Sequence, residues 1–362
     1  MIRVVLATLM TLALTGPIRA AVEIQEVTSP GGTEAWLVED HSIPFAALEI
    51  RFRGGTSLDA PGKRGVVNLM TGLIEEGAGD MDARAFAEAR DGLAASFEFD
   101  SHRDALTVSA RFLTENRDEA LALLREALIN PRFDEDAVER VRGQVLSVIR
   151  SEATDPDSMV TREFNAITYG DHPYATDPSG TIESVSALTR DDIVAAHKAL
   201  LARDRIYVGA TGDITAEELG QILDYLFSDL PETGAPLPGV AEVQLTGGTT
   251  VVPFETPQSV ARFAHEGIPR DDPDFFAAFV TNQILGGSGR QSRLSFEVRE
   301  QRGLTEGVGA CLVNDDHADL VIGQRASAKD RMGQALDVRR DEGEKSAAEG
   351  VTEPELDEAK TG

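Results

Sequence analysis

The amino-acid sequence predicts an α+β fold with two domains, and three patterns support the prediction. Segments of strict alternation, such as Ala47–Arg53, predict half-buried strands. Segments with apolar residues at helical spacing, such as Arg117–Ile129, predict amphipathic helices. The order of strand, glycine- or proline-containing break and helix occurs near the start and again after residue 248, which indicates an internal duplication. With 362 residues, of which 41% are hydrophobic, the chain is long enough for two cores.

The first twenty residues have the features of a secretory signal peptide. Arg3 precedes an apolar run, Gly16-Pro17 breaks that run, and Ala20 is a small residue at the expected cleavage position. The run is too short for a membrane anchor, which needs roughly 20 apolar residues. The single Cys311 excludes an internal disulfide. The sequence therefore predicts signal peptide 1–20 and an exported protein, most simply a resident of a bacterial periplasm.

The charge balance excludes some classes of partner. The formal net charge is −28, and removal of residues 1–20, which carry two arginines and no acid, takes it to −30. A chain of this charge is unsuited to binding nucleic acid or an anionic membrane. The acidity favours cationic peptides as ligands or serves solubility alone, and both interpretations stay open.

The first domain is expected over residues 21–230. Prolines mark helix ends at Asn130-Pro131 and Asp155-Pro156. The expected elements are, in order, two strands within Glu23–Glu39, a strand at Ala47–Arg53, helices at Gly65–Ile74 and Asp82–Ala94, a hairpin of Ser96–Phe99 and Leu106–Phe112, helices at Arg117–Ile129, Asp134–Glu152, Ser158–Tyr169 and Thr189–Leu201, a strand at Arg205–Gly209 and a helix at Ala216–Leu230.

A linker and a second domain follow. Residues 231–248 contain three prolines and four glycines, which is typical of a linker. Residues 249–362 then repeat the opening order with a strand at Ser259–Glu266 and a helix at Phe275–Leu285, ended by Gly286-Gly287. This domain would hold roughly 115 residues against about 200 in the first. We therefore expect it to be incomplete, either as a truncated form or with core surface that a partner covers.

Several short motifs, in order along nearly the whole mature chain, resemble one protein family. They are Gly54–Asp59 with Lys63–Val66, Asp155-Pro156, Tyr169–Ala175, Gly180-Thr181 through Leu188-Thr189, Val208–Thr215, Ile284–Gly287, Ser292–Leu294 and Val298–Leu304. Together they resemble the M16 peptidases, inverted zinc proteases of the insulinase and mitochondrial-processing-peptidase type. The resemblance implies two M16-type domains, each a mainly antiparallel sheet covered by helices, joined by the linker as a clamshell.

The family's zinc ligands do not carry over to this chain. Its H-x-x-E-H motif places two histidines and a general base on one helical face. Aligned through Gly65-Val66, these three positions hold Asn68, Thr71 and Gly72, and the third ligand position, counted back from Asp155-Pro156, holds Val148. Such side chains cannot hold Zn²⁺ or activate its water. The nearby Glu75 and Glu76 are expected to be a solvated helix end, and Glu152, one turn from Val148, could rescue only one position.

The second half of the family often supplies an arginine and a tyrosine that hold the substrate carbonyl. By resemblance the arginine is Arg299, whereas the tyrosine position holds Glu306. Arg299 is thus a candidate for substrate binding, with a salt bridge among neighbouring acids as the alternative. Gly286 and Gly287 begin a glycine-rich stretch that is either a substrate-contacting loop or a helix-ending turn.

The resemblance with vacant zinc positions implies a non-catalytic subunit. Such a subunit would bind no metal of its own and would pair, as a heterodimer, with a zinc-bearing M16 homologue to enclose a peptide chamber. The alternatives are a stand-alone peptide-binding or scaffold protein and, with less support, an active zinc metallopeptidase.

Overall fold

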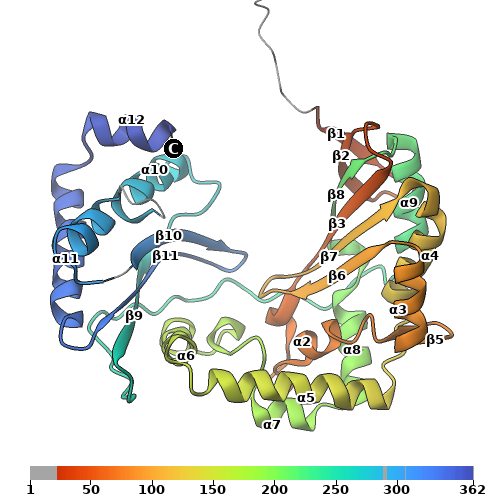
Figure 1. Cartoon of the computed structure of the whole chain (residues 1–362), viewed down its shortest axis with the longest axis horizontal. Coiled ribbons are helices and arrows are strands. Elements are labelled where there is room, and N and C mark those ends of the chain that lie inside the picture. Colours follow the sequence, from red (N-terminus) through yellow and green to blue (C-terminus); the bar gives the residue numbers. More distant parts are fainter. Residues whose placement is uncertain (1–22, 288–291, 306, 362) are drawn as a thin grey trace, which may run out of the picture.

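The computed structural model describes residues 23–287, 292–305 and 307–361. The predicted signal peptide at 1–20 lies outside this range. Two halves, each with its own sheet, stand side by side and meet near the middle of the molecule (Figure 1). The chain is thus an α+β protein, as the sequence predicts.

The first half contains a six-stranded sheet with the strand order β1-β2-β8-β3-β7-β6. A two-stranded ribbon, β4-β5, accompanies it. The strands are β1 (Gln25–Thr28), β2 (Glu34–Glu39), β3 (Phe45–Arg53), β4 (Gly77–Ala78), β5 (Met81–Asp82), β6 (Ser96–Ser101), β7 (Ala105–Leu113) and β8 (Ile206–Gly212).

The helices of the first half include short 3-10 turns, labelled η. They are η1 (Gly55–Leu58), α2 (Val66–Thr71), α3 (Ala83–Gly92), η2 (Thr114–Asn116), α4 (Arg117–Ile129), α5 (Glu135–Glu152), α6 (Pro156–Tyr169), η3 (Pro173–Ala175), α7 (Ile182–Ala187), α8 (Arg190–Leu200), η4 (Arg203–Arg205) and α9 (Ala216–Phe227). Helices α3, α4 and α9 cover one face of the sheet, and the opposite face is turned toward the second half (Figure 1).

The six-stranded sheet is mainly antiparallel, as expected, and contains one parallel pair of strands. Strand β8 pairs antiparallel with β3 but parallel with β2. A parallel pair needs a long crossover, and here almost the whole first half separates the two strands. The alternation in β3 is confirmed, because Leu48, Ile50 and Phe52 are all buried.

Helix α2 is shorter than the predicted Gly65–Ile74 and ends at Thr71. Its start is held by the buried Asp59, whose carboxylate accepts hydrogen bonds from Gly65 N at 2.6 Å and Val67 N at 3.1 Å. Burial raises the pKa of Asp59 to about 7, against the opposing effect of these amides. The helix ends at Gly72, a weak helix former, beyond which the chain turns.

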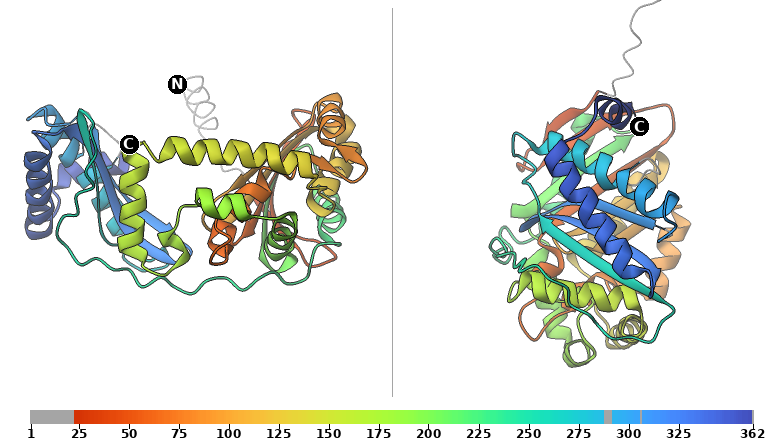
Figure 2. Two further views of the ribbon diagram at one scale, coloured as in Figure 1. Left: turned by 90° about the horizontal axis from the view of Figure 1, so that it is seen from below. Right: turned by 90° about the vertical axis from the view of Figure 1, so that its left-hand side faces the viewer.

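The second half contains a three-stranded antiparallel sheet with the order β10-β11-β9. Its elements are β9 (Gln258–Glu266), α10 (Phe275–Gly286), the π-helical turn η5 (Ser295–Glu300), β10 (Gly307–Asp315), β11 (Ala318–Ala328), α11 (Met332–Glu349) and α12 (Glu353–Thr361). Figure 2 shows α6 of the first half on one face of this sheet and α11 on the other.

The chain between α9 and β9, residues 228–257, forms no helix or strand. The predicted linker 231–248 lies inside this segment. It is fixed to the structure at several points: Ala241 N donates to His317 O at 2.8 Å and Gln244 N to Thr168 O at 2.8 Å. The linker therefore packs along both halves instead of spanning them freely.

The two halves are joined by a cluster that we call the junction, made of Asp104, Tyr174 and the β10–β11 turn at Asp316-His317. The Tyr174 hydroxyl donates to Asp104 Oδ2, which also accepts a bond from Asp316 N at 3.1 Å. His317 N in turn donates to the Tyr174 oxygen at 3.2 Å. Arg103 lies over the Tyr174 ring. Three segments distant in sequence are thus tied at one buried point.

Two ion pairs reinforce the junction from its edges. Arg53 at the end of β3 pairs with Asp316, and Arg103 pairs with Asp315 at 3.1 Å. All four side chains are a quarter to two-fifths exposed. Each pair therefore contributes modestly and adds to the buried hydrogen bonds and to the apolar cluster around Tyr174.

We expect Tyr174→Phe to destabilise the protein by about 1–3 kcal/mol, because Asp104 and His317 N would lose a partner inside the junction. Thermal unfolding measures the loss, and small-angle scattering should show a wider spread of distances between the halves. Tyr225→Phe, which removes the hydroxyl of a 46% exposed tyrosine, is the matched control. Equal stability of the two variants would contradict a structural role for the Tyr174 hydroxyl.

Candidate functional site

The positions aligned with the family's zinc site lie on two helices in contact, α2 and α5. Gly72 at the end of α2 faces α5, since a Cβ placed on it would lie 3.2 Å from Cγ1 of Val141. Val148 lies seven residues further along α5, about two turns. Its side chain is 50% exposed. The position aligned with the third ligand thus presents an aliphatic side chain to solvent.

The polar side chains at these positions make structural hydrogen bonds. Thr71 is buried, and its hydroxyl donates to Val67 O at 2.8 Å within the helix. Asn68 Oδ1 accepts a bond from the Ser101 hydroxyl at 3.2 Å. Neither residue offers a group that Zn²⁺ favours. Throughout the described ranges, no three His, Cys, Asp or Glu side chains gather closely enough to hold a metal ion.

The expectation that Glu75 and Glu76 form a solvated helix end is wrong. Both follow the end of α2 and are half-buried. Glu75 pairs with Arg90 of α3 at 2.7 Å, and Glu76 accepts two bonds from Arg140 of α5, at 2.8 and 2.7 Å. Burial raises the pKa of the Glu75 carboxyl, and Arg90 opposes that rise. These acids fix the chain after α2 against two neighbouring helices.

Arg299 lies in the other half, on η5, away from α2 and α5. It forms a long ion pair with Glu300, with 3.9 Å between Nε and Oε1. Glu297, the second acid beside it, pairs with Arg302 instead. The side chain of Arg299 is 38% exposed, so its guanidinium is accessible to a ligand. Glu306, the residue at the family's tyrosine position, lies outside the described residues.

Gly286 and Gly287 end α10 where it meets β10. A Cβ on Gly286 would lie 2.9 Å from both the Cβ and the N of Ala310, and one on Gly287 would lie 2.7 Å from Gln283 O. Glycine is therefore needed here for close packing of the helix end. Residues 288–291, which continue the glycine-rich stretch, lie outside the described part of the chain.

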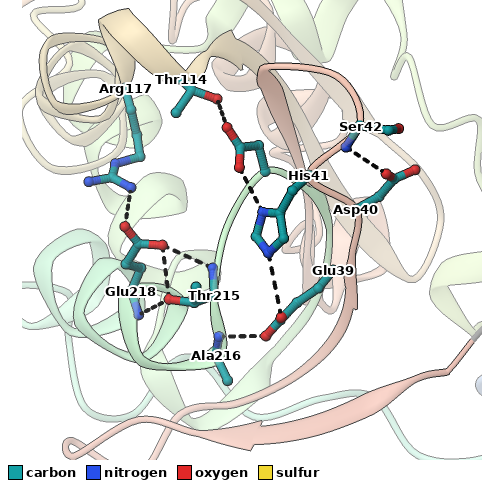
Figure 3. A network of polar contacts seen from close by, with 10 residues as sticks. Glu39, Asp40, His41, Ser42, Thr114, Arg117, Thr215, Ala216 and Glu218 are labelled. Atoms are coloured by element: carbon teal, nitrogen blue, oxygen red, sulfur yellow. Dashed lines mark hydrogen bonds and ion pairs between the residues drawn. The ribbon is translucent and has the colours of Figure 1, made fainter.

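A second polar network surrounds His41 on the first half (Figure 3). His41 Nδ1 lies 2.7 Å from Asp213 Oδ1, and Nε2 lies 3.8 Å from a Glu39 carboxylate oxygen. Thr114 donates to the other Asp213 oxygen at 2.8 Å, and Ala216 N donates to Glu39 at 3.1 Å. The hydrogen bond from Asp213 raises the pKa of His41. The His41 side chain is 54% exposed, and Asp213 and Glu39 each accept a further hydrogen bond, from Thr114 and from Ala216 N. The network therefore links the end of β2 to the β8–α9 turn at the surface.

Two constrained polar groups escape prediction from the sequence. Tyr174 belongs to the motif Tyr169–Ala175, which gives no sign that its side chain is fully buried in the junction. Arg325 on β11 is 2% exposed, and none of its three guanidinium nitrogens has a hydrogen-bond partner. The available signal for Arg325 is a cation within an alternating, mostly apolar strand.

We expect Asp213→Asn to lower the pKa of His41 toward its ordinary value of 6.5, because the main cause of its rise would be weakened. NMR titration of the His41 ring measures this. A pKa raised on folding gives stability that is complete below the unfolded pKa and is lost as pH rises through the folded pKa. The advantage of wild type over the variant should therefore shrink above about pH 6.5. Asp40→Asn, which removes a neighbouring charge but no bond to His41, is the control, and an equal effect of both variants would contradict the assignment.

The triple variant Asn68→His, Thr71→Glu and Gly72→His should not bind zinc at the affinity of a catalytic site. Val148 leaves the site one ligand short, and a side chain at position 72 would press on Val141. Elemental analysis after dialysis against a weak chelator tests this. The same triple variant with Val148→Glu is the comparison. Stoichiometric zinc in the triple variant alone would show that the third ligand position has been misaligned.

Comparison with known protein families assigns both halves to one family. Residues 35–181 match the model described as insulinase (peptidase family M16), and residues 187–362 match the model described as peptidase M16 inactive domain. The second model begins before α8, within the sequence that builds the first sheet.

Individual relatives carry different names. The chain is 25% identical, over 89% of its length and 74% of the relative, to the non-peptidase homolog YmxG of Helicobacter pylori. It is also 25% identical to an uncharacterized zinc protease of Mycobacterium tuberculosis, over 94% of this chain and 78% of the relative. A probable mitochondrial-processing peptidase subunit beta of Arabidopsis thaliana is 24% identical over 74% of this chain and 51% of its own length.

Solved structures share the fold. The crystal structure of a peptidase M16 inactive domain from Pseudomonas fluorescens superposes with a TM-score of 0.85 at 28% identity, over 94% of this chain and 82% of that one. A chain of complex III2 from Candida albicans superposes with a TM-score of 0.73 at 15% identity, over 94% and 80% of the two chains. The matches to both family models, in the order of the two sheets, show that this chain belongs to the M16 peptidase family.

Proposed function

We propose that this chain is an exported, non-catalytic M16 subunit that pairs with a zinc-bearing homologue and forms one wall of a peptide-enclosing chamber. The observation that carries the proposal is the state of the aligned zinc positions. Asn68 and Thr71 make structural hydrogen bonds, Gly72 is an exposed glycine next to Val141 of α5, and Val148 is an exposed aliphatic residue. Side chains of these types can neither hold a zinc ion nor activate a water molecule for peptide hydrolysis.

The names of two relatives support the same proposal. One is called a non-peptidase homolog and the other a probable mitochondrial-processing peptidase subunit beta, whereas a third is called an uncharacterized zinc protease. In such a heterodimer the partner subunit would bind the zinc ion and catalyse peptide cleavage, and this chain would bind substrate. The acidic surface then suits cationic segments of a peptide substrate. The signal peptide predicted from residues 1–20 supports export of the complex, and a bacterial periplasm is the compartment that we propose.

The open face of the first sheet is suited to be the chamber wall. It carries two exposed aromatic side chains on adjacent strands, Trp36 at 65% and Tyr207 at 57% exposure. Glu49 and Arg51 of β3 lie on the same face. Exposed aromatics beside charged groups are typical of peptide-binding surfaces. With the second half facing it, this surface would close on a peptide as a clamshell.

The isolated chain should bind no stoichiometric zinc and cleave no peptide, whereas a mixture with the zinc-bearing homologue should cleave peptides. A quenched fluorescent peptide library and elemental analysis measure the two properties. The homologue with Gln in place of its motif glutamate is the control for the source of activity. Chelator-sensitive cleavage by the isolated chain, with one zinc per chain, would overturn the proposal.

The wall can be tested in the same mixture. Trp36→Ala and Tyr207→Ala should raise KM more than they lower kcat, because the residues bind substrate without touching the reacting atoms. Tyr225→Ala, an exposed tyrosine on α9 at the opposite face, is the matched control. If the chain binds peptides but copurifies with no homologue from its host, the stand-alone peptide-binding function replaces the subunit function.

A further inference from the structure

A pocket of about 370 Å³ lies where the open face of the first sheet meets the linker. Arg53 at the end of β3 and Tyr207 near the start of β8 line it on the sheet side, and linker residues 233–237 line it on the other. Both side chains lie on the open face, because their neighbours Phe52 and Val208 are buried in the core behind it. We call this space the linker pocket. It is continuous with the surface that we propose as the chamber wall.

The linker side of the pocket is built by specific bonds within the chain. The buried Arg205 donates to Asp204 at 2.9 Å and to Ala235 O at 2.8 Å. Asp204 also accepts a bond from Gly234 N at 3.3 Å. A Cβ on Gly234 would lie 2.4 Å from the guanidinium carbon of Arg205 and 2.5 Å from Ala199 O, so glycine is required for this close approach. The pocket is therefore formed before any ligand binds.

The linker pocket contains hydrogen-bond donors that have no partner in the described part of the chain. Arg53 uses its Nε to bond Asp316, and its two terminal nitrogens bond to no described residue. Its side chain is 40% exposed, and the Tyr207 hydroxyl beside it is likewise free among the described residues. The terminal nitrogens of a guanidinium form a planar fork that fits a carboxylate. The acid that lines the pocket, Asp204, is occupied by Arg205 and a linker amide, so it does not compete for the fork.

Another side of the linker pocket is apolar. Pro236 and Leu237 line it together with the ring of Tyr207. Leu237 is held close to the turn after β3, since a Cβ on Gly54 would lie 3.2 Å from Leu237 Cδ2. An apolar side chain gains free energy when it leaves water for such a surface. The pocket thus combines a free cationic fork with an apolar wall.

This combination defines the chemistry of the ligand. Because both features line one small pocket, one residue of the ligand has to supply a carboxylate and an apolar side chain together. An internal Asp or Glu supplies only the carboxylate, and an internal Leu or Phe supplies only the apolar side chain. The last residue of a peptide supplies both. A free amino acid would also bring an ammonium group next to the Arg53 guanidinium, where like charges repel.

We propose that the linker pocket binds the C-terminal residue of a peptide. Arg53 and the Tyr207 hydroxyl hold the terminal carboxylate. The Tyr207 ring, Pro236 and Leu237 pack against its side chain, which is apolar. The preceding residues then lie over the open face of the first sheet, where Trp36 stands on the strand adjacent to β8. The choice of a peptide as the ligand rests on the peptide-enclosing chamber proposed above.

An end-binding pocket has a consequence for any cleavage by a partner subunit. A peptide that is held by its C-terminus lies on the wall in one direction only. The position of the pocket on this chain then sets the distance from the C-terminus of the substrate to the bond that is cleaved. Substrate selection by this chain is therefore a selection for chain ends.

The first test compares two forms of one peptide on the isolated full chain. A short fluorescent peptide that ends in leucine should bind about tenfold more tightly with a free C-terminal carboxylate than with a C-terminal amide, because only the carboxylate accepts both bonds of the Arg53 fork. Fluorescence anisotropy measures both affinities. Equal affinities, or no binding of either form, overturn the proposal.

The second test uses both partners of one ion pair. Arg53→Gln should abolish the preference for the free acid and leave the affinity of the amide unchanged. Asp316→Asn breaks the same ion pair but keeps the fork, so the preference should remain. Arg111→Gln, on the same face at the other end of the β3–β7 ladder, is the control for general attraction of the carboxylate. Loss of the preference in Asp316→Asn would assign the effect to the junction, and loss in Arg111→Gln would assign it to overall charge. Either result contradicts the pocket.

A third probe distinguishes a peptide from a small carboxylic acid. N-acetyl-leucine carries the same terminal carboxylate and side chain but cannot reach the open face. It should bind about tenfold more weakly than the free-acid peptide, because it lacks the contacts made by the preceding residues. Equal affinity would identify a small carboxylic acid as the ligand and overturn a peptide.

These binding measurements need neither zinc nor a partner subunit, so they separate the pocket from the subunit function. If the free acid is preferred but no mixture with the zinc-bearing homologue cleaves peptides, the subunit function fails and the pocket stands. If the mixture cleaves peptides but binds and cleaves the acid and the amide alike, the pocket fails and the subunit function stands.

Discussion

A buried carboxylate lies at the centre of the contact between the two halves, beside the apolar cluster that joins Tyr174 to Leu320. Asp104, at the end of the β6–β7 turn, accepts the Tyr174 hydroxyl and the amide of Asp316 on one oxygen, whereas its other oxygen is buried without a partner. Burial and the bond to Asp104 raise the pKa of Tyr174, so its phenol remains a donor at any ordinary pH. Hydrogen bonds are strong in low-dielectric surroundings and an unmade one is costly, so the loss of either remaining bond would be costly. This contact fixes the hairpin of one half against the hairpin of the other, and with it the spacing between the open sheet face and the second half.

The residues that we align with the family's zinc site make structural contacts in this chain. Thr71 stands where a general base would be and bonds back to its own helix. Glu75 and Glu76 follow it, but each is held by an arginine from another helix. Acidic side chains held in this way are not available to a metal. Packing of α2 and ion pairs in the segment that follows it thus stabilise this part of the fold.

The sequence predicts features that depend on neighbouring residues better than features that depend on contacts between residues far apart in the chain. Strand β3 and helix α4 follow from local periodicity, and the vacant motif follows from its flanks, because both signals lie within a few residues. The end of α2 at Thr71 does not follow, because the apolar residues Leu73 and Ile74 continue the pattern beyond it. The ion pairs of Glu75 and Glu76 with α3 and α5 are also out of reach of a local pattern. The parallel pairing of β2 with β8 also cannot be predicted from a local pattern, because the two strands lie at opposite ends of the first half. Nor can alternation reveal that Arg325 lacks a partner.

The two sheets differ in chemistry at one pair of equivalent positions, Ala110 and Arg325. Both occupy the sixth pair of a nine-residue ladder. In the first half the position is apolar, and its sheet is completed on that side by β8 and covered by helices. In the second half the same position carries the guanidinium of Arg325, which is 2% exposed and has no hydrogen-bond partner among the described residues. A buried, unpaired charge is costly, whereas a buried methyl group is not. Equivalent positions of the two sheets therefore contribute to stability with opposite sign.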